Sequence, residues 1–237
     1  MQANKVLFTL CARNGSKGVV NKNVRNILNK PLIMYTIEFL QKCAFKTHLV
    51  VSTDGNPISN VVKNDVDWVH QRPSELAGDT VARWPVLIDV VEACEKKYSI
   101  EYDYIFDFLG TAPLRRSEDL DACYQMVQKD DVDNVVTAVP SHRNPYFNML
   151  QIKPSRVNPE IICKAEKEIT RRQDAPETYD MNGSIYAWKR ESLFSSSQLL
   201  NRNTRLHVMP ELTSVDVDTE KDFEFLEFLI KKHGIPE

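Results

Sequence analysis

Short apolar runs rich in β-branched residues alternate along the chain with longer segments in which apolar residues recur with helical period. The runs predict strands at 6–12, 47–53, 104–110, 134–139 and 184–188, and the segments predict helices at 31–43, 84–98, 117–130 and 219–233. Alternating strands and helices require crossover connections. The sequence therefore predicts an α/β fold with a doubly wound, mostly parallel sheet, whose ligand would lie beyond the carboxyl ends of the strands.

One segment, at about 141–183, departs from this alternation. Its stretch 146–164 combines prolines with short apolar runs, which predicts a small inserted hairpin arm. No internal repeat or clean linker divides the rest, so residues 1–237 are expected to form a single domain. The apolar residues of the arm suit an interface between copies more than a monomer surface, so we expect a homodimer.

Composition limits the partners. A net charge of −3 and a pI of about 6.0 argue against a general nucleic-acid binder. No apolar run reaches the roughly 18 residues of a membrane span, and no signal-peptide pattern is present, so a cytoplasmic protein without membrane contact is expected. The five cysteines are widely spaced and never form a C-x-x-C pair, which predicts free thiols and not a disulfide framework or a zinc cluster.

The loop after the first predicted strand holds the first candidate chemistry. It carries Gly15 and Gly18, two of only seven glycines in the chain, together with Arg13, Lys17 and Lys22. Glycines let successive backbone N–H groups turn toward an anion, and the three cations add full charges, so the loop suits a polyphosphate. It matches neither the P-loop nor the dinucleotide fingerprint. On spacing alone, a solvated basic turn is an equal alternative.

A series of motifs in order along the chain carries a resemblance. Together they resemble the CMP-sialic acid synthetases, or acylneuraminate cytidylyltransferases, and are most similar to the branch that makes CMP-legionaminic acid. The motifs are "ARNGSKGVVNKN" (12–23), "VVSTD" (50–54), "RPSELAGDT" (72–80), "TAPLR" (111–115), "NGSIY" (182–186) and "DVDTEKDF" (216–223). The resemblance implies a Rossmann-like nucleotidyltransferase that uses Mg²⁺ to transfer CMP from CTP to a nine-carbon α-keto acid sugar, with release of pyrophosphate.

The same resemblance implies roles for the basic loop and its neighbours. Arg13 and Lys17 would hold the triphosphate, Lys22 would lie near the α-phosphate, and Asn23 with Arg72 would contact the cytosine. These positive charges fit an in-line displacement, in which the protein mainly supplies positioning and charge. A surface salt bridge is the alternative for Arg72. Arg13 and Lys22 are therefore candidate catalytic residues.

The motif "SVDVDTEKDF" adds a candidate metal site. Residues two apart in an extended strand project from one face, which places Asp216 and Asp218 side by side. Paired carboxylates beside phosphates favour Mg²⁺ over zinc, and Asp218 joins the candidate catalytic residues. The alternative is that this stretch only caps the last helix, since Thr219 and Asp222 approximate a capping box. Both can hold at once.

Further candidates follow from the resemblance with plainer alternatives beside them. Asp79 and Thr80 could contact the ribose or cap the helix predicted at 84–98. Arg172, favoured over Arg171, would bind the sugar carboxylate, with a solvated basic turn as the alternative. Tyr186 could line the sugar site or belong to the core.

Three positions depart from the sialic acid pattern. Leu109 stands where that family usually has a glutamine that faces the sugar, and Asp180 and Phe147 stand where basic residues are frequent. A pocket with fewer hydrogen-bonding groups favours a less hydroxylated substrate, because an unpaired hydroxyl in a closed site costs roughly 1 to 3 kcal/mol. We therefore expect legionaminic acid as the acceptor.

Three alternatives stay open. The acceptor could be N-acetylneuraminic acid. A related enzyme that activates the eight-carbon sugar Kdo would share the loop logic, although "KN" at 22–23 and "DVDT" at 216–219 argue against it. A catalytically inactive nucleotide-binding protein of the same fold is the third, and it would be expected to have lost the charged residues that this chain keeps.

Overall fold

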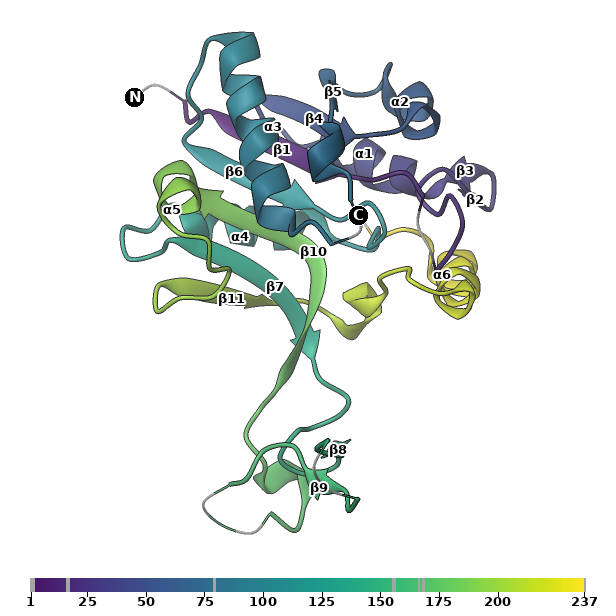
Figure 1. Ribbon diagram of the computed structural model, residues 1–237, viewed down its shortest axis with the longest axis vertical. Coiled ribbons are helices and arrows are strands. Elements are labelled where there is room, and N and C mark those ends of the chain that lie inside the picture. The colour runs from purple at the N-terminus through teal and green to yellow at the C-terminus, as the bar shows by residue number, and fades with distance from the viewer. Residues whose placement is uncertain are drawn as a thin grey trace.

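The computed structural model describes residues 3–15, 18–78, 80–154, 157–165, 167 and 169–236. Its centre is a seven-stranded sheet in the order β11-β7-β10-β6-β1-β4-β5 (Figure 1). The strands of this sheet are β1 (Val6–Cys11), β4 (His48–Thr53), β5 (Trp68–Gln71), β6 (Tyr104–Phe108), β7 (Asn134–Pro140), β10 (Tyr179–Lys189) and β11 (Thr204–Val208). The helices are α1 (Leu32–Gln41), α2 (Asn56–Val62), α3 (Arg83–Tyr98), α4 (Ser117–Val127), α5 (Arg190–Ser195) and α6 (Glu220–His233), with short 3₁₀ turns at Ser74–Leu76, Arg172–Asp174 and Glu211–Ser214.

The predicted doubly wound, mostly parallel sheet is confirmed. β1 pairs in parallel with β4 and β6, β4 with β5, and β7 with β11. β10 is the exception, because it runs antiparallel to both β6 and β7. It is also longer than the predicted strand, since it continues out of the sheet toward the inserted segment. The edge strands β5 and β11 were not predicted; both are short and carry polar residues that weaken the pattern.

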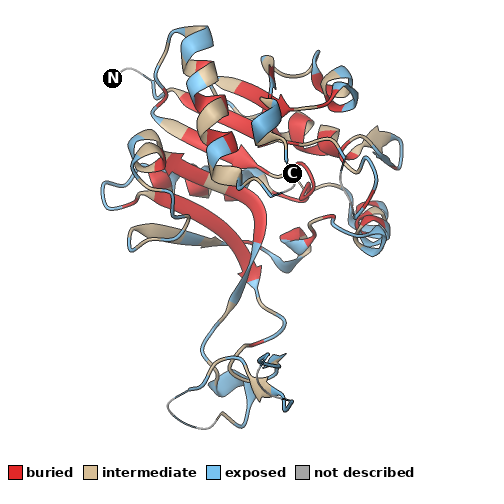
Figure 2. Cartoon of the chain, viewed as in Figure 1, coloured by how far each residue is buried: buried red, intermediate tan, exposed pale blue. Residues whose placement is uncertain are grey.

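Two apolar layers sandwich the sheet (Figure 2). Alternate strand residues such as Leu7 and Ile105 pack with Val90 and Val91 of α3 and with α5. The strand residues that point to the opposite face, such as Phe8, pack against α1, α2 and α4. Because side chains alternate across each strand, every central strand must be apolar on both faces, which explains its nearly continuous hydrophobic sequence.

A third apolar cluster holds the loops around the carboxyl edge of the sheet. Val19 from the basic loop packs with Val215, Val217 and with Phe223 at the start of α6. A small β-ladder between β2 (Asn26–Ile27) and β3 (Lys30–Pro31) supports the same region. The basic loop and the segment around residue 217 are therefore fixed against each other, although about 200 residues separate them in sequence.

The edge strand β11 is tied to α4 by a buried carboxylate. Asp119 accepts hydrogen bonds from Arg116 at 2.9 and 2.8 Å, and Nε2 of His207 in β11 lies 2.9 Å from its Oδ1. Burial alone would raise the pKa of Asp119, but these cationic partners outweigh it and lower the pKa to about 2. The network stabilises the edge of the sheet.

The inserted segment between β7 and β10 extends away from the sheet (Figure 1). It contains a small antiparallel ladder of β8 (Leu150–Gln151) and β9 (Glu160–Ile161). Leu150, Ile152 and Val157 are exposed here. The homodimer remains a prediction. Among the described residues, no helix is long and apolar enough to cross a membrane.

Candidate active site

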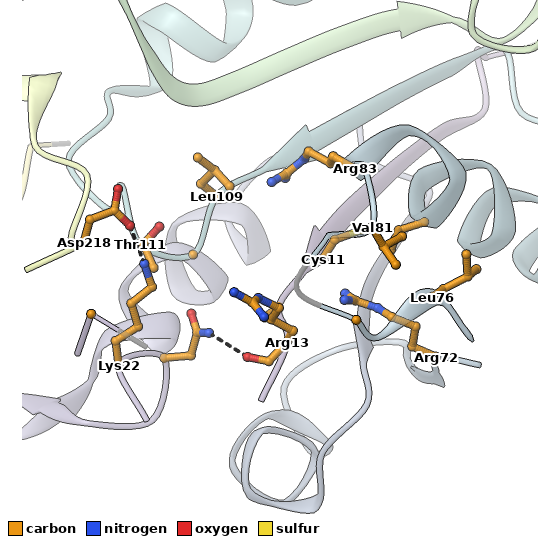
Figure 3. A pocket seen from close by; sticks show the side chains of 16 residues that line it. Cys11, Arg13, Lys22, Arg72, Leu76, Val81, Arg83, Leu109, Thr111 and Asp218 are labelled. Carbon is orange, nitrogen blue, oxygen red and sulfur yellow. Dashed lines mark hydrogen bonds and ion pairs between the residues drawn. The ribbon is translucent and has the colours of Figure 1, made fainter. Parts of the chain in front are cut away.

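A cavity of about 360 Å³ opens at the carboxyl ends of β1, β5 and β6 (Figure 3). The strand order reverses at β1, because β4 and β5 lie on one side of it and β6 lies on the other. Open α/β sheets bind their ligands at such a reversal point. The residues that line the cavity are Cys11, Ala12, Arg13, Gly18, Lys22, Asn23, Arg72, Leu76, Gly78, Val81, Arg83, Val86, Leu109, Gly110, Thr111 and Asp218. Six of the predicted site residues are therefore brought together: Arg13, Lys22, Asn23, Arg72, Leu109 and Asp218.

The two loop glycines have separate structural reasons. Gly15 has a φ of +75°, a backbone angle that residues with a side chain rarely adopt. A Cβ on Gly18 would lie 2.0 Å from the carbonyl oxygen of Asp218, so only glycine allows this close approach. The N–H of Asn14 donates to Oδ1 of Asp54 at 2.7 Å, which anchors the start of the loop to the end of β4. The predicted phosphate ligand Lys17 lies outside the described residues.

Lys22 crosses from the basic loop to the segment before α6. Its Nζ donates to the carbonyl oxygen of Val217 at 2.6 Å and to Oδ1 of Asp218 at 2.7 Å. The Lys22 side chain is 16% exposed and that of Asp218 is 72% exposed, so the lysine is held and the aspartate faces the opening. The ammonium group is thus fixed at the pocket wall, where it can interact with an anionic ligand.

Asn23 and Arg72 occupy two buried positions of the wall. Arg72 is only 6% exposed, and its Nη2 donates to the carbonyl oxygen of Ser52 at 3.0 Å. The surface salt bridge considered as its alternative is therefore wrong. Asn23 is also buried, and its Nδ2 donates a long hydrogen bond, 3.4 Å, to the carbonyl oxygen of Arg13. Both are buried polar side chains held by backbone carbonyl oxygens, an arrangement that suits recognition of a base.

The two metal candidates lie in an extended segment that belongs to no strand, so the strand assumed for them is wrong. The expected alternation still holds, because Val215 and Val217 point into the third cluster. Asp216 is half-buried, and its Oδ1 has no hydrogen-bond partner in the described structure. Burial raises the pKa of Asp216, a hydrogen bond with the Thr111 side chain only partly offsets the rise, and the nearby Asp218 carboxylate adds to it. An orphaned buried carboxylate oxygen beside a second carboxylate is a donor set that fits a hard divalent cation.

The helix-capping interpretation is confirmed, while the metal site remains a prediction. The Thr219 hydroxyl accepts from the N–H of Asp222, whose carboxylate accepts from the N–H of Thr219 at 2.7 Å. This capping box begins α6 immediately after Asp218. Within the described residues, no cluster of three or more acidic, histidine or cysteine side chains has the geometry of a complete metal site. Further oxygen ligands would have to come from a bound phosphate and water.

Sequence reasoning missed Arg83, the first residue of α3. Its Nε donates to Oδ2 of Asp107 at 2.5 Å, and Asp107 is fully buried in β6. Burial alone would lower the pKa of Arg83, but the buried carboxylate outweighs this and raises it above its ordinary value. Two signals could have revealed the pair: an aspartate inside the apolar run "YIFDFL" demands a partner, and "ARWPVL" offers an arginine at a helix start.

Cys11 was predicted only as a free thiol, and it lines the pocket. Burial, with a contribution from Asp107, raises the pKa of its thiol to about 12. The thiol is therefore neutral at pH 7 and is a poor nucleophile. Chemistry in this pocket depends on charge and positioning.

The candidates next to α3 have mixed outcomes. Thr80 is exposed. The N-cap residue of α3 is Ala82, and no side chain caps this helix, so the capping interpretation is wrong for Thr80. Asp79 lies outside the described residues. Tyr186 of β10 is half-buried and lines a neighbouring cavity. The centroid of its ring lies 5.9 Å from Cζ of Arg83. Leu109 packs over Gly183, whose φ of +62° and missing Cβ make room for it.

Arg172 and Asp180 are not brought to this pocket by their own chain. Arg172 lies in the inserted segment, where its Nη2 donates to the carbonyl oxygen of Ser141 at 3.0 Å. The hydroxyl of Ser141 in turn donates to Oδ1 of Asp180 at 2.8 Å. Both residues therefore belong to the base of the inserted segment in this structure.

The fold and the pocket define an α/β protein with a cation-rich cavity at the carboxyl edge of its sheet. Residues 8–231 match the family model described as Cytidylyltransferase, and the chain belongs to the cytidylyltransferase family. The resemblance drawn from the motifs is confirmed at this level.

Relatives and solved structures agree with the family. The chain is 40% identical to CMP-N,N'-diacetyllegionaminic acid synthase of Campylobacter jejuni over 95% of both chains. It is 37% identical to Post-translational flagellin modification protein B of Campylobacter coli over 98% of this chain and 97% of the other. It is 28% identical to N-acylneuraminate cytidylyltransferase of Streptococcus agalactiae over 92% of this chain and 52% of the other. In fold, it is similar to a CMP:2-keto-3-deoxy-manno-octonic acid synthetase, with a TM-score of 0.71 and 19% identity over 97% and 99% of the two chains.

Proposed function

We propose that this chain transfers CMP from CTP to a nine-carbon α-keto acid sugar, with legionaminic acid in its N,N'-diacetyl form as the preferred acceptor. The observation that carries the proposal is the cation-rich pocket at the carboxyl edge of the sheet of a cytidylyltransferase. The 40% identity to a CMP-N,N'-diacetyllegionaminic acid synthase over nearly the whole chain supports the choice of acceptor.

Most of the proposed nucleotide contacts have a matching group among the described residues of the pocket, and Lys17 is added from the resemblance alone. Asn23 and Arg72 are the buried polar groups that would contact cytosine, and Arg13 with Lys17 would hold the β- and γ-phosphates. Lys22 would face the α-phosphate, because it is held at the wall between the basic loop and Asp218. In the reaction, the C2 hydroxyl oxygen of the sugar bonds to the α-phosphorus, the bond to the bridging oxygen breaks, and pyrophosphate leaves. Fixed positive charge favours this step because negative charge grows on the leaving group.

Asp216 and Asp218 would hold Mg²⁺. The orphaned Oδ1 of Asp216 and its raised pKa support this, since a cation would satisfy the oxygen and stabilise the charged form. Bound there, Mg²⁺ would supply Lewis-acid stabilisation of the phosphate charge. The ammonium of Lys22 now bonds Asp218, so a metal ligand role for Asp218 would free Lys22 for the phosphate.

The acceptor side of the pocket is poor in hydrogen-bonding groups at Leu109. A leucine offers no partner for a hydroxyl-rich sugar tail, whereas a deoxy tail loses nothing there. We further propose that the protein acts as a homodimer through the inserted segment, whose exposed apolar residues include Leu150 and Val157.

A pyrophosphate-release assay tests the function. The protein is incubated with CTP, Mg²⁺ and, in separate reactions, N,N'-diacetyllegionaminic acid, N-acetylneuraminic acid and Kdo. The proposal expects release with the nine-carbon acids, with the highest kcat/KM for the legionaminic derivative. Preference for N-acetylneuraminic acid would reject the acceptor assignment alone. No release with any sugar acid, from protein that binds CTP, would support the inactive nucleotide-binding alternative.

A further inference from the structure

Arg83 lies between the nucleotide pocket and a second cavity. This cavity of about 230 Å³ is lined by Arg83, Trp84, Leu87, Tyr186, Trp188, Ser197 and Leu199, so Arg83 borders both spaces. In the view of Figure 3, its guanidinium points into the first pocket on the side of Leu109, and Arg13 and Arg72 lie across from it. The arginine is therefore placed on the acceptor side, apart from the cations assigned to the nucleotide.

The orientation of Arg83 is set by a buried carboxylate. Asp107 is fully buried, and besides the Arg83 Nε it holds the Thr9 hydroxyl through Oδ1 at 2.8 Å. Nη2 of Arg83 donates to the carbonyl oxygen of Phe108 at 3.3 Å. A carboxylate without a partner is costly in an apolar sheet, so this pair is held firmly. The Arg83 side chain nevertheless stays 34% exposed and lines the pocket, with its guanidinium pointing into it in Figure 3.

The second cavity is mostly apolar. Its walls are mostly aromatic and aliphatic, with Leu87 and Leu199 among them. Trp188 also lines it, but the Nε1 atom of that tryptophan is buried and offers a ligand no accessible N–H. A triphosphate would find no partner for its charge on these walls apart from Arg83, so a polar ligand of Arg83 would lie in the first pocket.

We propose that Arg83, positioned by Asp107, binds the carboxylate of the acceptor sugar, in place of Arg172, which its own chain does not bring to the pocket. The inference rests on the proposed function. In an α-keto acid sugar, the carboxylate is bonded to the carbon that carries the attacking hydroxyl. A cation that holds the carboxylate must therefore lie close to the reacting phosphorus, and Arg83 lines that pocket. A planar guanidinium held along one edge can still present its other edge to a carboxylate.

The test compares the free acid of the acceptor with its C1 methyl ester, which lacks the charge. Because R83Q alone would leave Asp107 buried without a partner, the variant is R83Q/D107N, in which the amide oxygen can still accept the Thr9 hydroxyl. We expect kcat/KM for the free acid to fall about 100-fold, as for loss of a charged hydrogen bond. The ester should change little, so the acid-to-ester ratio should fall by a similar factor, and the KM for CTP should stay within about threefold. R83K should retain part of the ratio because it keeps the charge.

A matched control is R190Q/E95Q, which removes an arginine–carboxylate pair of similar burial far along the sheet, with Nε and Oε1 2.6 Å apart. It should leave the ratio unchanged. An unchanged ratio in R83Q/D107N, with both substrates equally impaired, would make Arg83 structural and overturn the proposal. A large rise in the KM for CTP at an unchanged ratio would place Arg83 on the triphosphate instead. Wild-type protein that uses no sugar acid would defeat the proposed function and this inference together, whereas an active wild type with an unaffected variant defeats only the inference.

Discussion

Asp216→Asn should make the metal-free protein more stable while it abolishes most activity. The Asp216 carboxylate is half-buried, one of its oxygens has no partner, and Asp218 lies two residues away on the same face. Replacing the carboxylate by an amide of nearly the same shape removes the charge and leaves the packing of Val215 and Val217 untouched. An ordinary structural aspartate would show the opposite effect, since its loss removes stabilising contacts.

The expected magnitude follows from the like-charge pair. Residues two apart in an extended chain are roughly 7 Å from each other, which gives about 2 kcal/mol of repulsion at an effective dielectric of 20. Because Asp218 is 72% exposed, screening reduces this to about 1 kcal/mol. That corresponds to a rise in Tm of about 2 to 4 °C for a domain of this size.

The pH dependence of the stability gain follows from the direction in which folding shifts the pKa of Asp216. The folded state raises the pKa of Asp216 above 3.8, so the folded protein binds this proton more tightly than the unfolded chain. The charged form therefore destabilises the protein at pH values above the raised pKa, and this cost disappears as the pH falls through it. The stability gain from D216N should be full at pH 7 and absent below about pH 4.

The assay combines thermal unfolding with turnover. With CTP and Mg²⁺ present, wild-type Tm should rise, and the rise should be much smaller in D216N because one metal ligand is lost. Pyrophosphate release should fall about 100-fold or more. A metal-free D216N protein that unfolds several degrees below wild type would refute the reasoning about charge. Near-normal turnover at limiting Mg²⁺ would refute the metal assignment.

The remaining predictions test other parts of the structure. Lys22→Ala should reduce kcat by about 100- to 1,000-fold and affect CTP affinity less, because charge near the α-phosphate matters most as it reacts; a pure affinity loss would contradict this. Thr219→Ala removes the hydroxyl that caps the N–H of Asp222 and should lower stability by about 1 kcal/mol in chemical denaturation. Asp119→Asn should cost about 2 kcal/mol above pH 4, and the difference should shrink as the pH falls toward 2, because the folded pKa is lowered to about 2. Analytical ultracentrifugation should find a dimer, and substituting Leu150 by glutamate should produce monomers; a wild-type monomer at all concentrations would exclude the interface.

Much of the fold follows from local pattern. The five predicted strands and four predicted helices are all present, because central strands such as β1 are apolar on both faces and helices such as α3 have a clear apolar stripe. The direction of β10 could not be predicted, since a strand carries the same pattern in either orientation. Its reversal depends on the inserted segment, which brings the chain back along the sheet after β7.

The site was predicted where motifs name residues and missed where tertiary contact defines them. Lys22 and Asp218 are 196 residues apart along the chain, yet the sequence placed both in one site only through a family resemblance. Their direct hydrogen bond could not be anticipated. Arg83 had no motif of its own, because its importance comes from the burial of Asp107 on a neighbouring strand.

The contact at Gly18 explains why the metal candidates and the basic loop must act together. The absence of a side chain at Gly18 lets its backbone lie against the carbonyl of Asp218, and this proximity allows Lys22 to reach both Val217 and Asp218. An aspartate shared between a lysine and a metal ion cannot fully satisfy both, since its charge is single. If a cation occupied the aspartates, the lysine would lose part of its partner and gain freedom to follow a phosphate. The geometry would then link nucleotide charge, metal charge and the position of Lys22 through one close backbone contact, which any side chain at residue 18 would break.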